Sequence, residues 1–174
     1  MEFVCNDMKQ AEFVFPDKRE MVEEDKAVEL LDALIPALDA PTKLDLSNKS
    51  YSDAAAVKIA ECLAKITSLT DVDIHDMIAG RPEEEALRSF TAICDSLKQN
   101  TIKSLNISDN ALGAKGVAAC RDLMAQSSLK SLYVLNNGIS EAAAELIHTV
   151  LFEEGRNMNM VPGSMLLWIP WHSF

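Results

Sequence analysis

The chain has 174 residues, of which 48% are hydrophobic and 25% charged, and its formal net charge at pH 7 is -11. This length and composition suit one folded domain with a buried core. The acidic balance argues against nucleic-acid binding, because phosphate contacts depend on Lys and Arg, and it favours a partner with a basic face. No apolar run approaches the roughly 18 residues of a membrane span, so we expect no membrane insertion.

The first part of the chain divides into two segments. Residues 1–22 contain acidic side chains and lack the continuous apolar stretch of a signal peptide, so we assign them to an N-terminal extension. Over residues 23–40, apolar side chains recur at helical spacing and predict an amphipathic helix.

An alternating pair of apolar residues then recurs four times along the chain, as Leu44/Leu46, Val72/Ile74, Leu105/Ile107 and Leu132/Val134. Such a pair is typical of a short strand with one side facing the core. We therefore predict strands near residues 43–47, 71–75, 104–108 and 131–135. The first members of the pairs lie 28, 33 and 27 residues apart.

A helix-length pattern follows each predicted strand, and one strand with its helix is called a unit below. The predicted helices cover residues 53–66, 83–99, 114–126 and 141–152. Ser52 and Ser140 occupy N-cap positions. Pro82, followed by three glutamates, is a strong helix start because the helix N-terminus favours negative charge.

Two units match the pattern L-x-x-L-x-L-x-x-N-x-L in full, at residues 102–112 and 129–139. This is the leucine-rich-repeat signature. The sequence therefore predicts an α/β leucine-rich-repeat solenoid over residues 23–154, with about four parallel strand–helix units forming a right-handed crescent. The helix over residues 23–40 is expected to cap its open end, since a terminal repeat otherwise exposes its core face.

Asparagine occurs at two places in the turn after the strand. Asn110 and Asn137 occupy the consensus position, where we expect a buried amide that bonds loop backbone. One position earlier, each unit has a polar residue on the solvent side: Asn48, Asp76, Asp109 and Asn136. We call these four residues the rim. The repeat pattern gives this position no structural duty, so the rim is either a partner-binding edge or a merely solvated loop edge.

Three further features lie outside the regular repeat. The second unit has about five extra residues in the segment 77–85, which contains Arg81, and such insertions tend to lie on the binding face. Residues 155–174 are a divergent apolar tail, either an unusual cap or the mark of a truncated product. The four cysteines show no C-x-x-C spacing, so we expect reduced, buried side chains and neither a metal nor a cofactor.

Three segments resemble the leucine-rich-repeat domain of Ran GTPase-activating proteins, closest to the plant type: HDMIAGRPEEEAL (75–87), LNISDNALGAKGV (105–117) and LYVLNNGISEAAAELI (132–147). The resemblance implies a monomeric regulator of nucleocytoplasmic transport that binds GTP-bound Ran and accelerates GTP hydrolysis without chemistry of its own. It also implies a cytoplasmic location, including the outer face of the nuclear envelope.

The resemblance further implies a mechanism without an arginine finger. A rim asparagine of the family, which corresponds to Asn136, holds Ran's catalytic glutamine so that the attacking water is aligned. The arginine of the family's Gly-Arg motif corresponds to Arg81 and serves binding and orientation. Asp76, Asp109 and Asn48 of the rim are the other candidate partner-binding residues.

The chain departs from the family pattern at both ends. Full members have many more repeats and an acidic C-terminal region, and the plant type has a Trp-Pro-Pro targeting domain that residues 1–15 do not supply. The alternative functions are a non-catalytic leucine-rich-repeat scaffold and an inactive truncated product. An independent enzyme is not indicated, since the sequence has no Gly-rich phosphate loop and no nucleophile or metal motif.

Overall fold

A computed structural model describes residues 10–16, 18–35, 38–153 and 166–168 of the chain. Its main feature is a parallel sheet in the order β1-β3-β5-β6-β7-β8. These strands are β1 (Gln10–Val14), β3 (Leu38–Asp45), β5 (Asp71–Asp73), β6 (Ser104–Asn106), β7 (Ser131–Tyr133) and β8 (Leu166–Trp168). A second, two-stranded parallel sheet pairs β2 (Glu20–Val22) with β4 (Lys49–Tyr51).

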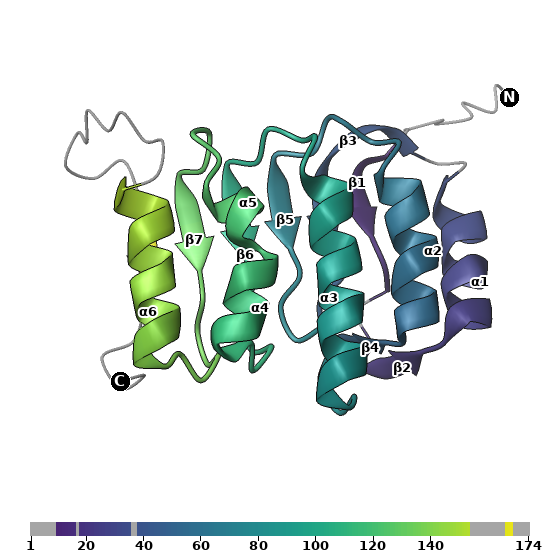
Figure 1. The fold of residues 1–174 in the computed structure, drawn as a ribbon. Coiled ribbons are helices and arrows are strands. Elements are labelled where there is room, and N and C mark those ends of the chain that lie inside the picture. The colour runs from purple at the N-terminus through teal and green to yellow at the C-terminus, as the bar shows by residue number, and fades with distance from the viewer. Residues whose placement is uncertain (1–9, 17, 36–37, 154–165, 169–174) are drawn as a thin grey trace, which may run out of the picture.

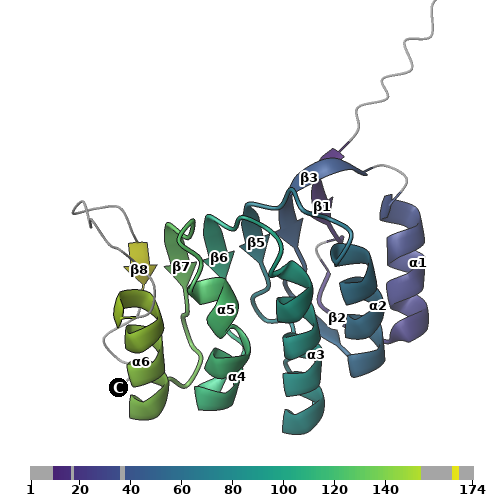
Figure 2. The same ribbon diagram turned by 45° about the horizontal axis from the view of Figure 1, so that its top comes forward.

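The helices lie on one side of the main sheet (Figures 1 and 2). They are α1 (Glu24–Leu34), α2 (Asp53–Leu63), α3 (Glu83–Leu97), α4 (Gly113–Ala119), α5 (Arg121–Met124) and α6 (Glu141–His148), which continues into a π-helical turn, η2 (Thr149–Glu153). From β3 to β7 each strand is followed by its helix, and each unit lies beside the next. This α/β arrangement is compatible with a leucine-rich-repeat fold.

The predicted strands and their register are confirmed, although each strand ends two residues earlier than predicted and β3 begins at Leu38. Leu44 pairs with Val72, Val72 with Leu105, and Leu105 with Leu132, all in parallel. The apolar side chains of these strands are buried, as the period of two requires. The equivalence of the four units therefore holds residue by residue along the sheet.

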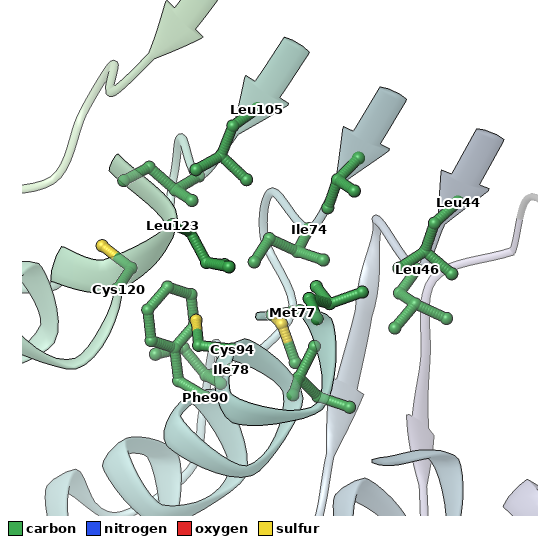
Figure 3. Packing of buried hydrophobic residues seen from close by; sticks show 14 of the residues in the cluster. Leu44, Leu46, Ile74, Met77, Ile78, Phe90, Cys94, Leu105, Cys120 and Leu123 are labelled. Atoms are coloured by element: carbon green, nitrogen blue, oxygen red, sulfur yellow. The ribbon is translucent and has the colours of Figure 1, made fainter. Parts of the chain in front are cut away.

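The core lies between the sheet and the helices. Figure 3 shows Ile74 and Leu105 from the strand side and Phe90 and Leu123 from the helix side gathered in this layer. All four of these side chains are fully buried. Because each helix presents one apolar stripe to the strands, the units pack through a continuous interior.

Three cysteines lie in the described part of the chain, and all three are free thiols. Cys94 and Cys120 are buried in the core, as predicted, and burial raises the pKa of Cys120 to about 12 and that of Cys94 well above its usual value. Cys62 is half-buried, and partial burial also raises its pKa. These thiols therefore stay protonated and act as small apolar side chains.

The predicted helix starts are also confirmed. Ser52 Oγ accepts a hydrogen bond from Ala55 N at 3.2 Å, and Ser140 Oγ accepts one from Ala143 N at 3.3 Å. Each serine thus satisfies one of the N–H groups that a helix leaves unpaired at its start. The third predicted start is right as well, since α3 begins at Glu83 directly after Pro82.

Helix ends were predicted less well. The helix expected over residues 23–40 stops at Leu34, and β3 begins at Leu38. A proline at position 36 explains the early stop, because proline lacks the N–H that would continue the helix, although Ile35 before it is still helical. The helix expected over residues 114–126 is interrupted at Cys120, which has φ -97° and ψ 10°.

Strands near both ends of the chain pair with strands of the units. Residues 10–14, within the predicted extension 1–22, form β1, which pairs with β3, and residues 20–22 form β2, which pairs with β4. At the other end, β8 pairs with β7 through Leu132 and Leu167. The remaining residues of the segment 155–174 lie outside the described part of the chain, so the choice between a cap and a truncated product stays open.

Candidate functional site

The four rim residues follow the carboxyl ends of four neighbouring strands and share one backbone conformation. Their φ values are 55° for Asn48, 48° for Asp76, 60° for Asp109 and 50° for Asn136. This left-handed region is unfavourable for most residues, whereas Asn and Asp tolerate it. The hypothesis that the position has no structural duty is therefore wrong, because the turn itself favours these residue types. Exposure and side-chain contacts, and not residue type, therefore distinguish the rim positions from one another.

The consensus asparagines, by contrast, are buried as predicted. Asn110 is 3% exposed and Asn137 is 0% exposed. Asn137 Oδ1 accepts from Asn110 N at 2.9 Å, and its Nδ2 donates to Ile107 O at 2.9 Å. Asn110 in turn accepts from Met77 N at 2.8 Å. The two amides thus connect the turns of three successive units and hold the rim above them in a fixed position.

In the first unit, Lys49 occupies the position that Asn110 and Asn137 hold in later units. Its side chain is 0% exposed, and its Nζ donates to Pro16 O and Lys18 O, both at 2.7 Å. The Nζ also lies 3.3 Å from Glu20 Oε1. Lys49 therefore ties the first turn to the β1–β2 loop, much as each asparagine ties one turn to the unit before it.

Asn136 lies at the exposed end of the rim, as predicted, and so does Asp109. The Asn136 Nδ2 donates to Asp109 Oδ1 at 2.9 Å. A carboxylate can only accept, so this contact fixes which side of the amide faces Asp109. Among the described residues, the Asn136 carbonyl oxygen has no hydrogen-bond donor within reach. The arrangement presents a fixed acceptor at the surface.

Arg81 is not an exposed arginine. Its side chain is 8% exposed, and its guanidinium contacts Glu23 at 2.7 Å and Glu85 at 3.3 Å. It also donates to Ser50 O at 2.9 Å and to Ser50 Oγ at 3.2 Å. These bonds connect the segment 77–85 with the first unit. In this structure Arg81 is therefore committed to contacts within the chain.

The other two rim residues, Asn48 and Asp76, belong to the first two units. Asp76 holds Arg19 of the β1–β2 loop through both guanidinium Nη atoms, one of them at 3.3 Å. Asn48 is half-buried, and its backbone N–H donates to His75 O at 3.4 Å. Arg19 escaped the sequence reasoning because residues 1–22 show no repeat pattern, and no signal in the sequence connects it with Asp76.

The face of the sheet away from the helices carries a polar cluster next to the rim. Asp73 Oδ1 lies 2.6 Å from His75 Nδ1, and its Oδ2 accepts from Asn106 Nδ2 at 3.1 Å. Beside these side chains, and partly lined by Tyr133, lies a shallow hollow of about 300 Å³. The cluster is half-buried, so it offers hydrogen-bonding groups and a flat surface to a large partner.

Comparison with known proteins identifies relatives of the chain. No family model matches the chain. It is 41% identical over 119 residues to RAN GTPase-activating protein 1 and 43% identical over 118 residues to RAN GTPase-activating protein 2, both of Arabidopsis thaliana. It is 32% identical over 129 residues to Ran GTPase-activating protein 1 of Saccharomyces cerevisiae. These alignments cover 67%, 67% and 71% of this chain.

The chain is a homologue of Ran GTPase-activating proteins. The resemblance drawn from the repeat segments is thus confirmed. The chain spans about a fifth of the length of the two Arabidopsis relatives and about a third of the yeast one, at 22%, 22% and 32%. Homology therefore identifies the relatives of this chain.

Two other kinds of site are not found in the described residues of this Ran GTPase-activating protein homologue. Among them, no group of three or more His, Cys, Asp or Glu side chains could hold a metal ion. In the same part of the chain, no helix is both long and apolar enough to cross a membrane. The rim presents oriented amides and carboxylates, which left-handed turns hold in place. Below it lie the two buried asparagines Asn110 and Asn137, which we call the asparagine ladder.

Proposed function

We propose that this chain activates GTP hydrolysis by the small GTPase Ran. In this proposal the rim and the face of the sheet away from the helices bind Ran in its GTP-bound form, and Asn136 positions Ran's own catalytic glutamine. The chain would then regulate an enzyme and carry out no chemistry itself. Homology to Ran GTPase-activating proteins supports the choice of partner.

The geometry of Asn136 is the observation that carries the proposal. Its NH₂ group is committed to Asp109, so its carbonyl oxygen is left to accept an N–H from the amide of a partner's glutamine. An acceptor held in advance loses little freedom on binding, and one positioning group of this kind typically contributes on the order of a hundredfold to the chemical step. Asp109 thus acts as the positioning residue for Asn136.

Arg81 fits this proposal in a changed role. A contact between Arg81 and Ran would require its bonds to Glu23, Ser50 or Glu85 to be exchanged. We propose instead that Arg81 contributes to affinity by holding the inserted segment 77–85 against the first unit. The segment could then present its backbone to Ran without an arginine finger.

The wider features of the family are proposed on the same basis. We infer that the strand–helix units form a leucine-rich-repeat solenoid, a right-handed crescent whose α1 covers one end of the helix layer. A monomer in the cytoplasm, including the outer face of the nuclear envelope, would then act in nucleocytoplasmic transport. The alternative is a leucine-rich-repeat scaffold that binds a protein without activating it.

A single-turnover assay of GTP hydrolysis by Ran tests the proposal. Asn136→Gly is the informative variant, because glycine keeps the left-handed backbone and removes only the amide. We expect the maximal rate at saturating activator to fall about a hundredfold while the half-saturating concentration changes little. Asn48→Gly is the matched control, since it makes the same substitution at the equivalent rim position and should keep the maximal rate.

Two outcomes would contradict the proposal. If the intact chain does not bind GTP-bound Ran in a titration, the scaffold alternative takes its place. If the chain stimulates hydrolysis and Asn136→Gly stimulates it equally well, Ran activation stands and the role of Asn136 is wrong.

A further inference from the structure

An exposed arginine, Arg19, lies beside the rim. Its side chain is 67% exposed, whereas that of Arg81 is 8% exposed. Arg19 lies in the β1–β2 loop, yet it pairs with Asp76 of the second unit, 57 residues further along the chain. The fold therefore brings a cation from outside the regular units next to a row of rim residues that are neutral or acidic.

The loop that carries Arg19 is anchored on both sides. Before it, Phe15 is 4% exposed and packs on Phe13, with ring centroids 5.5 Å apart. After it, Glu20 pairs with Lys49 in the parallel β2–β4 ladder. Lys49 Nζ additionally holds the loop through the carbonyl groups of Pro16 and Lys18. The backbone next to Arg19 is thus fixed by a buried charged group and by paired strands.

Asp76 fixes the other end of the side chain. Its carboxylate has a side-chain exposure of 13% and contacts both Nη atoms of Arg19. A bidentate contact of this kind sets the plane of the guanidinium and uses two of its five N–H groups. Within the described residues the other N–H groups bond no acceptor, so they can donate to one outside the chain.

Stability alone does not explain this arrangement. An exposed ion pair contributes only about 0–1 kcal/mol, because water screens it and two long side chains lose freedom. Here a fully buried lysine and a strand pair hold the loop that presents the arginine. The anchoring is much more extensive than such a surface pair requires, so a role in recognition accounts for it better.

We propose that Arg19 is a partner-binding residue beside the rim, whose outward N–H groups bond a carboxylate on the GTP-bound GTPase. This inference rests on the proposed function, because it takes Ran as the partner. The arginine adds one positive contact to an otherwise acidic surface, which fixes the register of the partner along the rim. Asp76 holds the guanidinium in place and contributes to binding through Arg19.

The test is the titration of GTP-bound Ran with the full chain, with the half-saturating concentration and the maximal single-turnover rate measured separately. Arg19→Ala is expected to raise the half-saturating concentration about tenfold at low salt and to leave the maximal rate unchanged. Arg19→Lys should restore affinity only in part, because an ammonium lacks the planar fork. Lys18→Ala is the matched control, as Lys18 is 75% exposed in the same loop.

The other possible results each reject either the role of Arg19 or the proposed function. Unchanged affinity in Arg19→Ala overturns the inference, and tighter binding would mean that Arg19 blocks Asp76. A reduced maximal rate at saturation would make Arg19 catalytic rather than a contact. If the unaltered chain fails to bind Ran, the proposed function fails and this inference fails with it. If the unaltered chain activates Ran while Arg19→Ala and Lys18→Ala behave alike, only the inference is wrong.

Discussion

The asparagine ladder makes a sharp prediction for the substitution Asn137→Ala. Truncation removes the acceptor of Asn110 N and leaves that buried N–H without a partner, at a cost of about 1–3 kcal/mol. It also removes the bond from Asn137 Nδ2 to Ile107 O, worth about 1 kcal/mol, although Asn110 Nδ2 still donates to that carbonyl at 3.1 Å. We therefore expect the free energy of unfolding to fall by about 3 kcal/mol.

For a domain of this size, 1 kcal/mol corresponds to a change in melting temperature of about 2–4 °C. Asn137→Ala should thus lower the melting temperature by about 6–12 °C, measured by circular dichroism with a urea titration as a check. The control is Asn136→Gly, which removes a neighbouring exposed amide and keeps the left-handed backbone. Its effect should stay within about 0.5 kcal/mol. Equal losses in the two variants would refute the division between a buried ladder and an exposed rim.

Three further predictions concern stability and thiol reactivity. Ala111 has a φ of 48°, and the equivalent residue of the next unit, Gly138, has a φ of 59°. Ala111→Gly should therefore raise the free energy of unfolding in urea by about 1 kcal/mol, and Gly138→Ala should lower it by a similar amount. A loss of stability in Ala111→Gly would contradict the left-handed turn. Lys49→Met keeps the apolar part of the side chain but leaves the carbonyl groups of Pro16 and Lys18 without their donor. It should lower the free energy of unfolding by about 2–3 kcal/mol and speed amide exchange in the β1–β2 loop. Exchange at the wild-type rate would show that Lys49 does not hold this loop. Iodoacetamide at pH 8 should leave Cys94 and Cys120 of the native protein unlabelled, because burial raises both thiol pKa values and blocks access. Rapid formation of either adduct, detected by mass spectrometry, would count against the packed core.

The repeat itself could be predicted from the sequence because its signal is strictly local. Alternating apolar pairs at near-constant spacing determine which side of each strand is buried, and the observed pairing of Leu44, Val72, Leu105 and Leu132 follows from that. The burial of Asn110 and Asn137 was predictable for the same reason. A position that recurs in several units can be compared with its equivalents in the other units, which makes the prediction at that position more secure.

The parts that the sequence did not predict depend on contacts made only once. Arg19 reaches Asp76 across 57 residues, and Lys49 replaces an asparagine by extending a longer side chain to the β1–β2 loop. Neither contact repeats, so no periodicity points to it. Arg81 was misplaced for the opposite reason: an arginine in an inserted loop is usually exposed, but here the carbonyl of Ser50 and two glutamates bind its guanidinium.

The rim also shows why residue type alone is a weak guide to a functional asparagine. All four rim positions need a residue that tolerates positive φ, so Asn or Asp would occur there even on a surface without a partner. Contacts between side chains separate the positions: Asn136 pairs with Asp109, and Asp76 pairs with Arg19. In each pair a carboxylate fixes the orientation of a neighbouring donor group. The two outer members, Asn136 and Arg19, are therefore held ready for a partner, which is the property that a positioning surface requires.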